Sequence, residues 1–239
     1  MVGINTQDKR RAVIEHLEEL RLRIIKCAIF IIAAGVICYN FSGKILSIII
    51  KPAGTTVFIA PQEAFVAHIK VAFIAGALLS VPFILFETWK FVSEALEEKE
   101  KKYILLFAPL SFIFFAAGAI FSYTVILPVA MRFLLSFSSE YMAPMLSVGM
   151  YVSFVGLLIF AFGIIFELPI AALFATKVGL ITPYFLSKRR REAIVVIFII
   201  AAFLTPPDVV TQALMAVPLL ILYEISIWVS KIAYRSRGS

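Results

Sequence analysis

The sequence predicts an all-α polytopic membrane protein with six transmembrane helices and with its N and C termini both in the cytoplasm. Hydrophobic residues make up 62% of the 239 residues and the mean hydropathy is +1.01, whereas soluble domains are only about half apolar. Apolar runs follow one another along the chain, and basic residues gather in alternate connections. No segment remains for a separate soluble domain, so residues 1–239 are expected to form a single six-span transmembrane domain.

Each predicted span is a run of apolar residues bounded by charged, proline or glycine residues. The runs cover about 22–41, 64–89, 103–137, 151–176, 193–204 and 209–229. The third run exceeds the roughly 20 residues that cross a bilayer, so we expect it to tilt or to bend at Pro109 or Pro128. The connection 42–63 is expected to hold a short amphipathic helix, an extended piece and a helix start at Pro61–Glu63.

The fifth and sixth spans are predicted to be short. Residues 193–204 form only about 18 Å of helix, which cannot cross an undistorted bilayer of about 30 Å. Pro206 and Pro207 prevent a simple continuation of this helix. We therefore expect a thinned bilayer or a recessed, partly hydrated outer face beside this span.

The distribution of basic residues sets the topology. The N-terminal segment, the connections 90–102 and 177–191 and the tail after 230 hold 18 of the 22 lysines and arginines. Because cytoplasmic loops carry the excess of Lys and Arg, these segments are assigned to the cytoplasm. The net charge of +7 is thereby explained by topology, so we do not expect nucleic acid as a partner.

Motifs of catalytic and metal sites are absent from the sequence. There is no HExxH, GxSxG, Walker loop or CxxC, and His16 and His68 belong to different segments. Cys27 and Cys38 are separated by about 16 Å of helix, too far for a disulfide or a shared metal ion. We therefore expect no catalytic residue, no metal and no cofactor.

Carboxylates at the cytoplasmic edge are the first candidates for function. Glu19 has Arg23 four residues later, so a solvated helix face with a weak ion pair would explain it equally well. In the run EEKEKK at 97–102, the first two glutamates have lysines at i+4, but Glu100 has Ile104 there. Glu100 is thus the acidic residue left without a local partner, and either simple solvation or the binding of a guanidinium group fits it.

Glu167 is the second candidate, because it lies within the apolar run of the fourth span. Its expected depth is the inner leaflet, where an ionised side chain is unfavourable and should face protein or water. Pro169 removes an amide donor beside it and opens the helix locally. A buried carboxyl satisfied inside its own bundle, a docking point for another chain and a hydrated path are the alternatives. Asp208 could likewise be a simple N-cap of the last helix.

Four stretches of the sequence form a recognisable pattern: HLEELRLR at 16–23, WKFV with LEEKEKK at 89–102, FELP at 166–169, and TPPDVVTQ followed by a proline and YE at 205–224. In their order and spacing they resemble the TatC family, the six-span receptor of the twin-arginine protein translocation system. The resemblance covers essentially the whole chain and implies a non-enzymatic receptor in the cytoplasmic (inner) membrane. It further implies binding of the Arg-Arg signal peptides of folded cargo proteins.

The resemblance also implies roles for individual residues and for partners. Glu19 and Glu100 would receive the two arginines, with Arg21 and Phe91 in the same patch. Single-span partner subunits of the TatA and TatB type would assemble along the short fifth helix and beside Glu167. Two further positions that the family pattern marks, both in outer connections, are Pro52 and Asp208. The stretch FVSEAL departs from the family, which commonly has proline where Glu94 stands here.

Two other functional classes were considered from the residues. A proton-coupled secondary transporter could use Glu167 as its titrating group, although no second carboxylate, lysine or arginine is expected at the same depth. An intramembrane hydrolase would need a Ser–His pair on the helices, which the sequence lacks. Besides lipid, association of the chain with further copies of itself is left open.

Overall fold

The computed structural model describes residues 6–94, 96, 101, 104–139, 141, 144–205 and 209–235. Helices dominate this part of the chain. In order they are α1 (Thr6–Tyr39), α2 (Ser42–Ile50), η1 (Lys51–Ala53), α3 (Glu63–Glu94), α5 (Ile104–Phe121), η2 (Ser122–Ile126), α6 (Leu127–Leu135), α7 (Val148–Ile165), α8 (Leu168–Val178), α9 (Pro183–Lys188), α10 (Arg190–Leu204) and α11 (Val209–Arg235).

The described residues confirm the all-α, multi-pass architecture. Five helical stretches are long and apolar enough to cross a membrane: His16–Tyr39, Glu63–Glu94, Leu105–Leu135, Val148–Val178 and Val209–Arg235. The predicted fifth span is α10, whose 15 residues give about 22 Å of helix. The last helix, α11, has 27 residues and continues six residues beyond the predicted end of the sixth span, so the prediction of a short sixth span was wrong.

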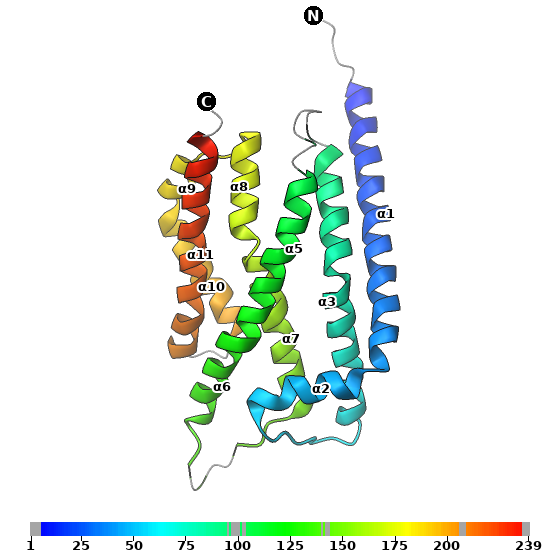
Figure 1. Ribbon diagram of the computed structural model, residues 1–239, viewed down its shortest axis with the longest axis vertical. Coiled ribbons are helices and arrows are strands. Elements are labelled where there is room, and N and C mark those ends of the chain that lie inside the picture. Colours follow the sequence, from blue (N-terminus) through cyan, green and yellow to red (C-terminus); the bar gives the residue numbers. More distant parts are fainter. Residues whose placement is uncertain are drawn as a thin grey trace, which may run out of the picture.

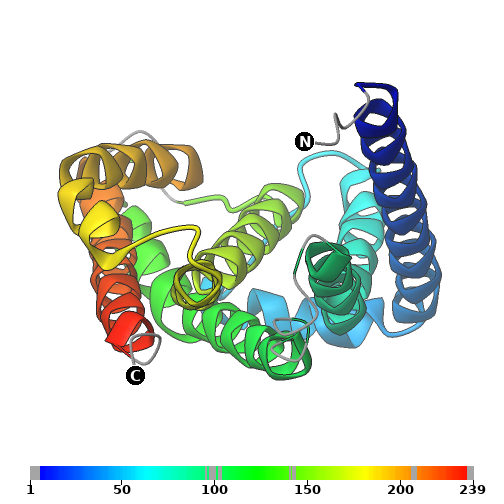
Figure 2. The same ribbon diagram turned by 90° about the horizontal axis from the view of Figure 1, so that it is seen from above.

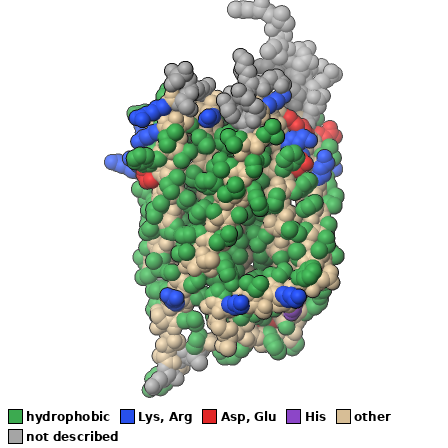
Figure 3. All heavy atoms as spheres, viewed as in Figure 1, with side chains coloured by type: hydrophobic (Ala, Val, Ile, Leu, Met, Phe, Trp, Pro, Cys, Tyr) green, Lys and Arg blue, Asp and Glu red, His purple; other side chains and the backbone are tan. Residues whose placement is uncertain are grey.

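The two ends of the chain lie on the same side of the molecule, as predicted. Thr6 begins α1 and Arg235 ends α11 at the upper side of Figure 1. A broad apolar belt separates lysines and arginines at the upper and lower margins of the surface (Figure 3). This is the surface expected of a protein embedded in a bilayer, with its charged groups at the two interfaces.

Helix α7 forms the centre of the bundle. Half of the most apolar part of the stretch Val148–Val178, which α7 begins, is buried, against 17% for that of His16–Tyr39 in α1. Seen from above, the pair α1 and α3 and the pair α10 and α11 lie at opposite ends, with α5 and α7 between them (Figure 2). Helix α1 packs mainly against α3, so the N-terminal helix is held at the rim of the bundle.

The bend of the third span lies before Pro128, one of the two predicted positions. Pro128 has no amide to donate to the carbonyl of Thr124, and the preceding turn, η2, takes π-helical geometry. Pro109 lies inside the continuous helix α5 instead. The bend separates α5 from α6 in Figure 1.

The outer connections are joined by specific hydrogen bonds. The predicted amphipathic helix is α2, which lies across the lower end of the bundle (Figure 1), and α3 starts at Glu63, as predicted. The Tyr151 hydroxyl donates to the Ile49 carbonyl at 3.0 Å. Val57 pairs with the second outer connection through bonds of 2.9 Å to Leu146 and Val148. These bonds satisfy backbone groups that would otherwise be exposed near the apolar core.

Candidate functional site

A buried arginine in the middle of α1, beside the C-terminal part of α3, contacts three carboxylates. The side chain of Arg23 is only 7% exposed. Its Nη1 lies 3.1 Å from Glu87 Oε2 and also donates to the Glu87 carbonyl at 3.2 Å. Its Nη2 donates to Oε1 of Glu94 and to Oε1 of Glu19. We call Arg23, Glu19, Glu87 and Glu94 the Arg23 cluster.

Helix geometry explains why these side chains meet. Glu19 and Arg23 are four residues apart and share one face of α1. Glu87 and Glu94 are seven residues, or two turns, apart and share one face of α3. The two helices run antiparallel and pack closely, which brings both faces together at the upper end of Figure 1.

The Arg23 cluster carries an excess of negative charge when its carboxyl groups are ionised. Three carboxylates surround one guanidinium, which leaves a net charge of two negative units. Glu87 is buried, but the side chains of Glu19 and Glu94 are 37% and 34% exposed. Their bonds to Arg23 use Oε1 of each residue. An incoming cation can therefore reach this pair from the solvent.

Phe91 and Arg21 occupy different sides of this site. Phe91 stacks on the His16 ring with the centroids 4.3 Å apart and the planes at 17°. It lies one turn before Glu94 and so covers the flank of the cluster. Arg21 is exposed and lines a shallow depression on α1 with Glu18, Glu19 and Leu22. The structure thus places Glu19, Phe91 and Arg21 at one end of the pair formed by α1 and α3.

Two members of the Arg23 cluster were not predicted from the sequence as site residues. Glu87 was not singled out as a site residue, and Glu94 appeared only as a departure from the family pattern. Because they are seven residues apart near the end of one predicted helix, the sequence indicates that they share a helix face. That this face contacts Arg23 follows only from the packing of α1 on α3. Glu100 and Asp208 lie outside the described residues.

A metal ion is not the best ligand for this cluster. A ring nitrogen of His16 and carboxylate oxygens of Glu19 and Glu94 lie within 4.8 Å of one another, close enough for a common ligand. Arg23 Nη2 already contacts both carboxylates, so a divalent ion between them would meet its positive charge. A planar guanidinium at the exposed edge can bond to the carboxylates without such close contact.

Glu167 lies at a break within the fourth span. Helix α7 ends at Ile165 and α8 starts at Leu168, with Pro169 in its first turn. Glu167 Oε1 is buried and has no hydrogen-bond partner among the described residues. The Ser111 hydroxyl lies close enough to interact with the carboxyl group, and it also accepts a bond of 2.9 Å from Trp89 Nε1. This junction is a polar point within an otherwise apolar region.

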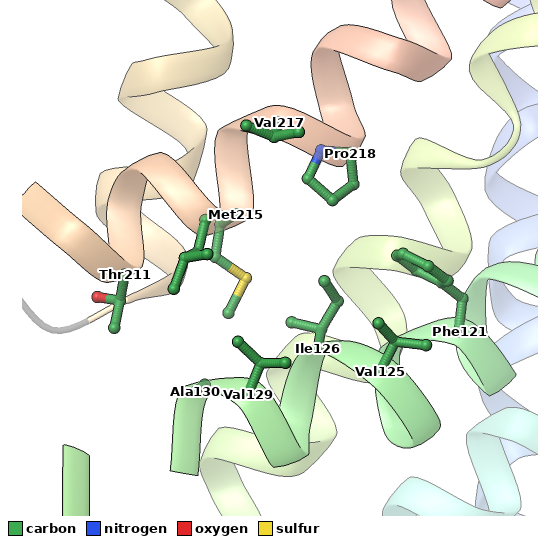
Figure 4. Close-up of a pocket in the computed structure, with 10 residues that line it drawn as sticks. Phe121, Val125, Ile126, Val129, Ala130, Thr211, Met215, Val217 and Pro218 are labelled. Atoms are coloured by element: carbon green, nitrogen blue, oxygen red, sulfur yellow. The ribbon is translucent and has the colours of Figure 1, made fainter. Parts of the chain in front are cut away.

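The outer side offers different chemistry. Pro52 lies in the single turn η1, whose Ala53 is buried. A cavity of about 220 Å³ lies between η2, α6 and the first half of α11. Figure 4 shows Ile126 and Met215 pointing into it, and Thr211 is the one polar residue among its ten lining residues. It offers no carboxylate that could attract a cationic ligand.

Comparisons with known proteins identify the family. A model of the family described as "Sec-independent protein translocase protein (TatC)" matches residues 15–218. The chain is 42% identical over 230 residues to the TatC protein of Carboxydothermus hydrogenoformans, covering 94% of this chain and 95% of that protein. It is 40% identical over 232 residues to the TatC protein of Aquifex aeolicus, covering 93% of this chain and 96% of that protein.

A solved structure shares the fold of the chain. It is described as the twin arginine translocase receptor TatC and superimposes with a TM-score of 0.83 at 39% identity. The match covers 91% of this chain and 99% of that structure. The relatives are translocase components, so the expectation of a non-enzymatic protein is confirmed. With its multi-pass helical fold and these similarities along nearly its whole length, the chain belongs to the TatC family of Sec-independent protein translocases.

Proposed function

We propose that this chain is the receptor of a twin-arginine translocase in the cytoplasmic membrane, and that the Arg23 cluster binds the consecutive arginines of signal peptides. The observation that supports the proposal is that three carboxyl groups surround one buried guanidinium and that two of them, Glu19 and Glu94, are about one-third exposed. With all three ionised, two guanidinium groups would neutralise the excess negative charge. The cargo would be a folded protein that carries such a peptide.

Glu87 and Arg23 would fix the geometry of the site rather than bind the peptide. Arg23 bonds to both helices, so it holds Glu19 of α1 and Glu94 of α3 side by side. Carboxylates held in this way are preorganised for the forked donors of arginine, which bind two oxygens at once. Lysine offers a single ammonium point charge and should bind less well.

Glu100 is proposed as a further acceptor. It follows Glu94 by six residues, so an intervening chain can reach at most about 20 Å from the end of α3. The resemblance to the family assigns Glu100 to the arginine site, and this distance allows both acceptors to serve one peptide. Arg21 and Phe91 would contribute to the same patch, since Arg21 repels misplaced positive charge and Phe91 supplies an aromatic face.

Glu167 is proposed to receive the single-span partner subunits of the TatA and TatB type. Its carboxyl oxygen Oε1 is buried without a partner among the described residues, and α10 is too short to span an undistorted bilayer. A partner helix carrying one polar residue could satisfy Glu167 and cover the thinned region. Pro52 and Asp208 would act in the outer connections of the same assembly.

The test is capture of a signal peptide by the purified protein. A fusion bearing an Arg-Arg signal peptide is expected to be retained, and its Lys-Lys counterpart to be retained about tenfold less, because the bidentate bonds are lost. Glu19→Gln and Glu94→Gln should each weaken capture of the Arg-Arg fusion. The matched control is Glu224→Gln, since Glu224 also pairs with an arginine, Arg190, but lies on α11. Equal capture of both fusions would refute the proposal.

A further inference from the structure

We propose that the cavity between η2, α6 and the first half of α11 binds one acyl chain of a phospholipid from the outer leaflet, and that Arg132 binds the phosphate of the same lipid. We call this cavity the outer groove. Its volume is about 220 Å³. Both of its walls belong to stretches that are long and apolar enough to cross a membrane, Leu105–Leu135 and Val209–Arg235. Lipid binding here is independent of signal-peptide capture.

The outer groove has a buried floor and an exposed rim. Four residues that are at most 7% exposed form the floor: Ile126, Ala130, Thr211 and Met215. Four residues that are between 39% and 54% exposed form the rim: Val125, Val129, Leu214 and Val217. Because the rim lies within membrane-spanning stretches, the medium at the mouth of the groove is lipid.

The lining of the outer groove favours an apolar filler. Empty space beside apolar side chains lowers stability in proportion to its volume. Water does not fill such space well, since apolar cavities of about 150 Å³ stay dry and bind apolar molecules. Thr211 is the one polar lining residue, and Figure 4 shows its hydroxyl directed away from the groove. An acyl chain is therefore the filler that the surrounding bilayer supplies.

The size of the outer groove distinguishes an acyl chain from a partner helix. One turn of a helix, about 10 Å wide and about 5.4 Å long, occupies roughly 420 Å³, which is nearly twice the volume of the groove. An acyl chain is a single row of methylene groups and can enter it. The space exists because both walls are irregular: η2 is a π-helical turn, and Pro218 has no amide to donate to the Leu214 carbonyl.

Arg132 supplies the charge that a lipid phosphate needs. It follows Val129 by three residues, so both side chains lie on one face of α6, and Arg132 lies about 4.5 Å nearer the outer end of that helix. Its side chain is exposed and forms no ion pair with any residue that the structure describes. A guanidinium can bond to two phosphate oxygens at once. The apolar groove and this cation together match the two parts of one phospholipid.

The test is retention of phosphatidylglycerol by the full-length protein in detergent, measured by native mass spectrometry after loosely held lipid has been washed away. The natural protein is expected to retain it. Diacylglycerol has the acyl chains but no phosphate, and it should be retained about fivefold less, because one basic residue contributes about this factor to the affinity for an anionic lipid. Glycerol phosphate, which has no acyl chain, should not bind. No retention of phosphatidylglycerol, equal retention of diacylglycerol, or binding of glycerol phosphate would overturn the inference.

Substitutions locate the retained lipid. Val129→Trp should lower retention of phosphatidylglycerol about tenfold, because the indole covers the mouth of the groove and excludes methylene groups. Val36→Trp is the control, at an exposed valine of α1 outside the groove. Arg132→Gln should lower retention about fivefold, whereas Lys44→Gln, at an exposed cation of α2, should leave it unchanged.

Melting temperatures separate loss of the lipid from loss of the fold. Without lipid, the variants should melt close to the natural protein. Added phosphatidylglycerol should raise the melting temperature of the natural protein and of both controls, and raise it less in Val129→Trp and Arg132→Gln. If Val129→Trp does not fold, Leu214→Trp on the opposite rim takes its place. Retention in the rim variant that equals retention in Val36→Trp would show that the lipid lies elsewhere, and the inference would be wrong.

Discussion

Gly35 and Gly76 bring the backbones of α1 and α3 into contact, since a Cβ atom added at residue 76 would lie 2.4 Å from Gly35 N and 2.6 Å from Gly35 Cα. The same two helices bring Glu19 and Glu94 to the guanidinium of Arg23, on the side of this contact nearer the N-terminus of α1 and the C-terminus of α3. Close packing at the glycines therefore sets the geometry of the charged site several turns away.

Gly76→Ala is expected to impair signal-peptide capture, because the new methyl group must push α1 away from α3 and separate Glu19 from Glu94. The measurement is retention of an Arg-Arg fusion together with the melting temperature in detergent. Gly35→Ala is the matched control, since its Cβ would have ordinary contacts of 3.8 Å or more. Equal effects of the two substitutions would contradict this account of the helix contact.

Arg23→Leu is expected to destabilise the protein by about 3 kcal/mol, because it leaves the buried Glu87 carboxylate without its cation. Thermal or denaturant unfolding in detergent measures the change. Arg190→Leu breaks the exposed pair with Glu224 and should cost less than about 1 kcal/mol. The combination of Arg23→Leu with Glu87→Leu should recover part of the loss. No recovery in the double variant would show that Glu87 is not the group left unpaired.

Glu63→Gln should loosen the outer connections without affecting capture. Glu63 Oε2 accepts from the Ile59 amide at 2.7 Å, and its Oε1 accepts from the Gly149 amide at 2.9 Å and from the Ser147 hydroxyl. Replacing the carboxylate by an amide removes charge from these bonds and weakens them. We expect faster proteolysis of the outer connections and unchanged binding of an Arg-Arg fusion. Gln62→Ala, at an exposed neighbouring position, is the control.

Glu167→Ala should leave signal-peptide capture intact and reduce association with single-span partner subunits. Glu167 lies within the membrane-spanning part of the chain, at the junction of α7 and α8. It is not a member of the Arg23 cluster, so the two sites can be tested separately. Co-purification of partner subunits and retention of an Arg-Arg fusion are measured on the same preparation. Loss of capture in Glu167→Ala would show that the two steps do not separate in this way.

High salt should weaken capture, because Glu19 and Glu94 are about one-third exposed and their attraction for arginine is screened. Retention of the Arg-Arg fusion is compared at 50 mM and 500 mM salt, where the screening length falls from about 14 to about 4 Å. The Lys-Lys fusion serves as the comparison. Capture that does not change with salt would favour an apolar contact as the main source of affinity.

Patterns within single segments predicted much of the fold. Apolar run lengths located the six spans and the short α10, and the missing amide of Pro128 explains the bend that follows α5. The amphipathic helix α2 was also predicted from its own residues. These features depend on local chemistry and on the thickness of the bilayer, which are both available from the sequence.

The charged site was predicted only in part, because it depends on contacts between segments far apart in the chain. The spacing of Glu19 and Arg23 predicted their pair. Nothing in the sequence shows that Arg23 is buried, or that Glu87 and Glu94, more than 60 residues later, share its guanidinium. Those contacts follow from the close packing that Gly35 and Gly76 allow.

The attachment of α1 mainly to α3 has a consequence for biogenesis. When α1 leaves the ribosome, Arg23 has only Glu19 of its three acidic partners, because Glu87 and Glu94 have not yet been synthesised. A guanidinium without its full set of counter-charges is held back at the membrane interface. Helix α1 should therefore settle into lipid together with α3, as a hairpin, and not as an independent first span.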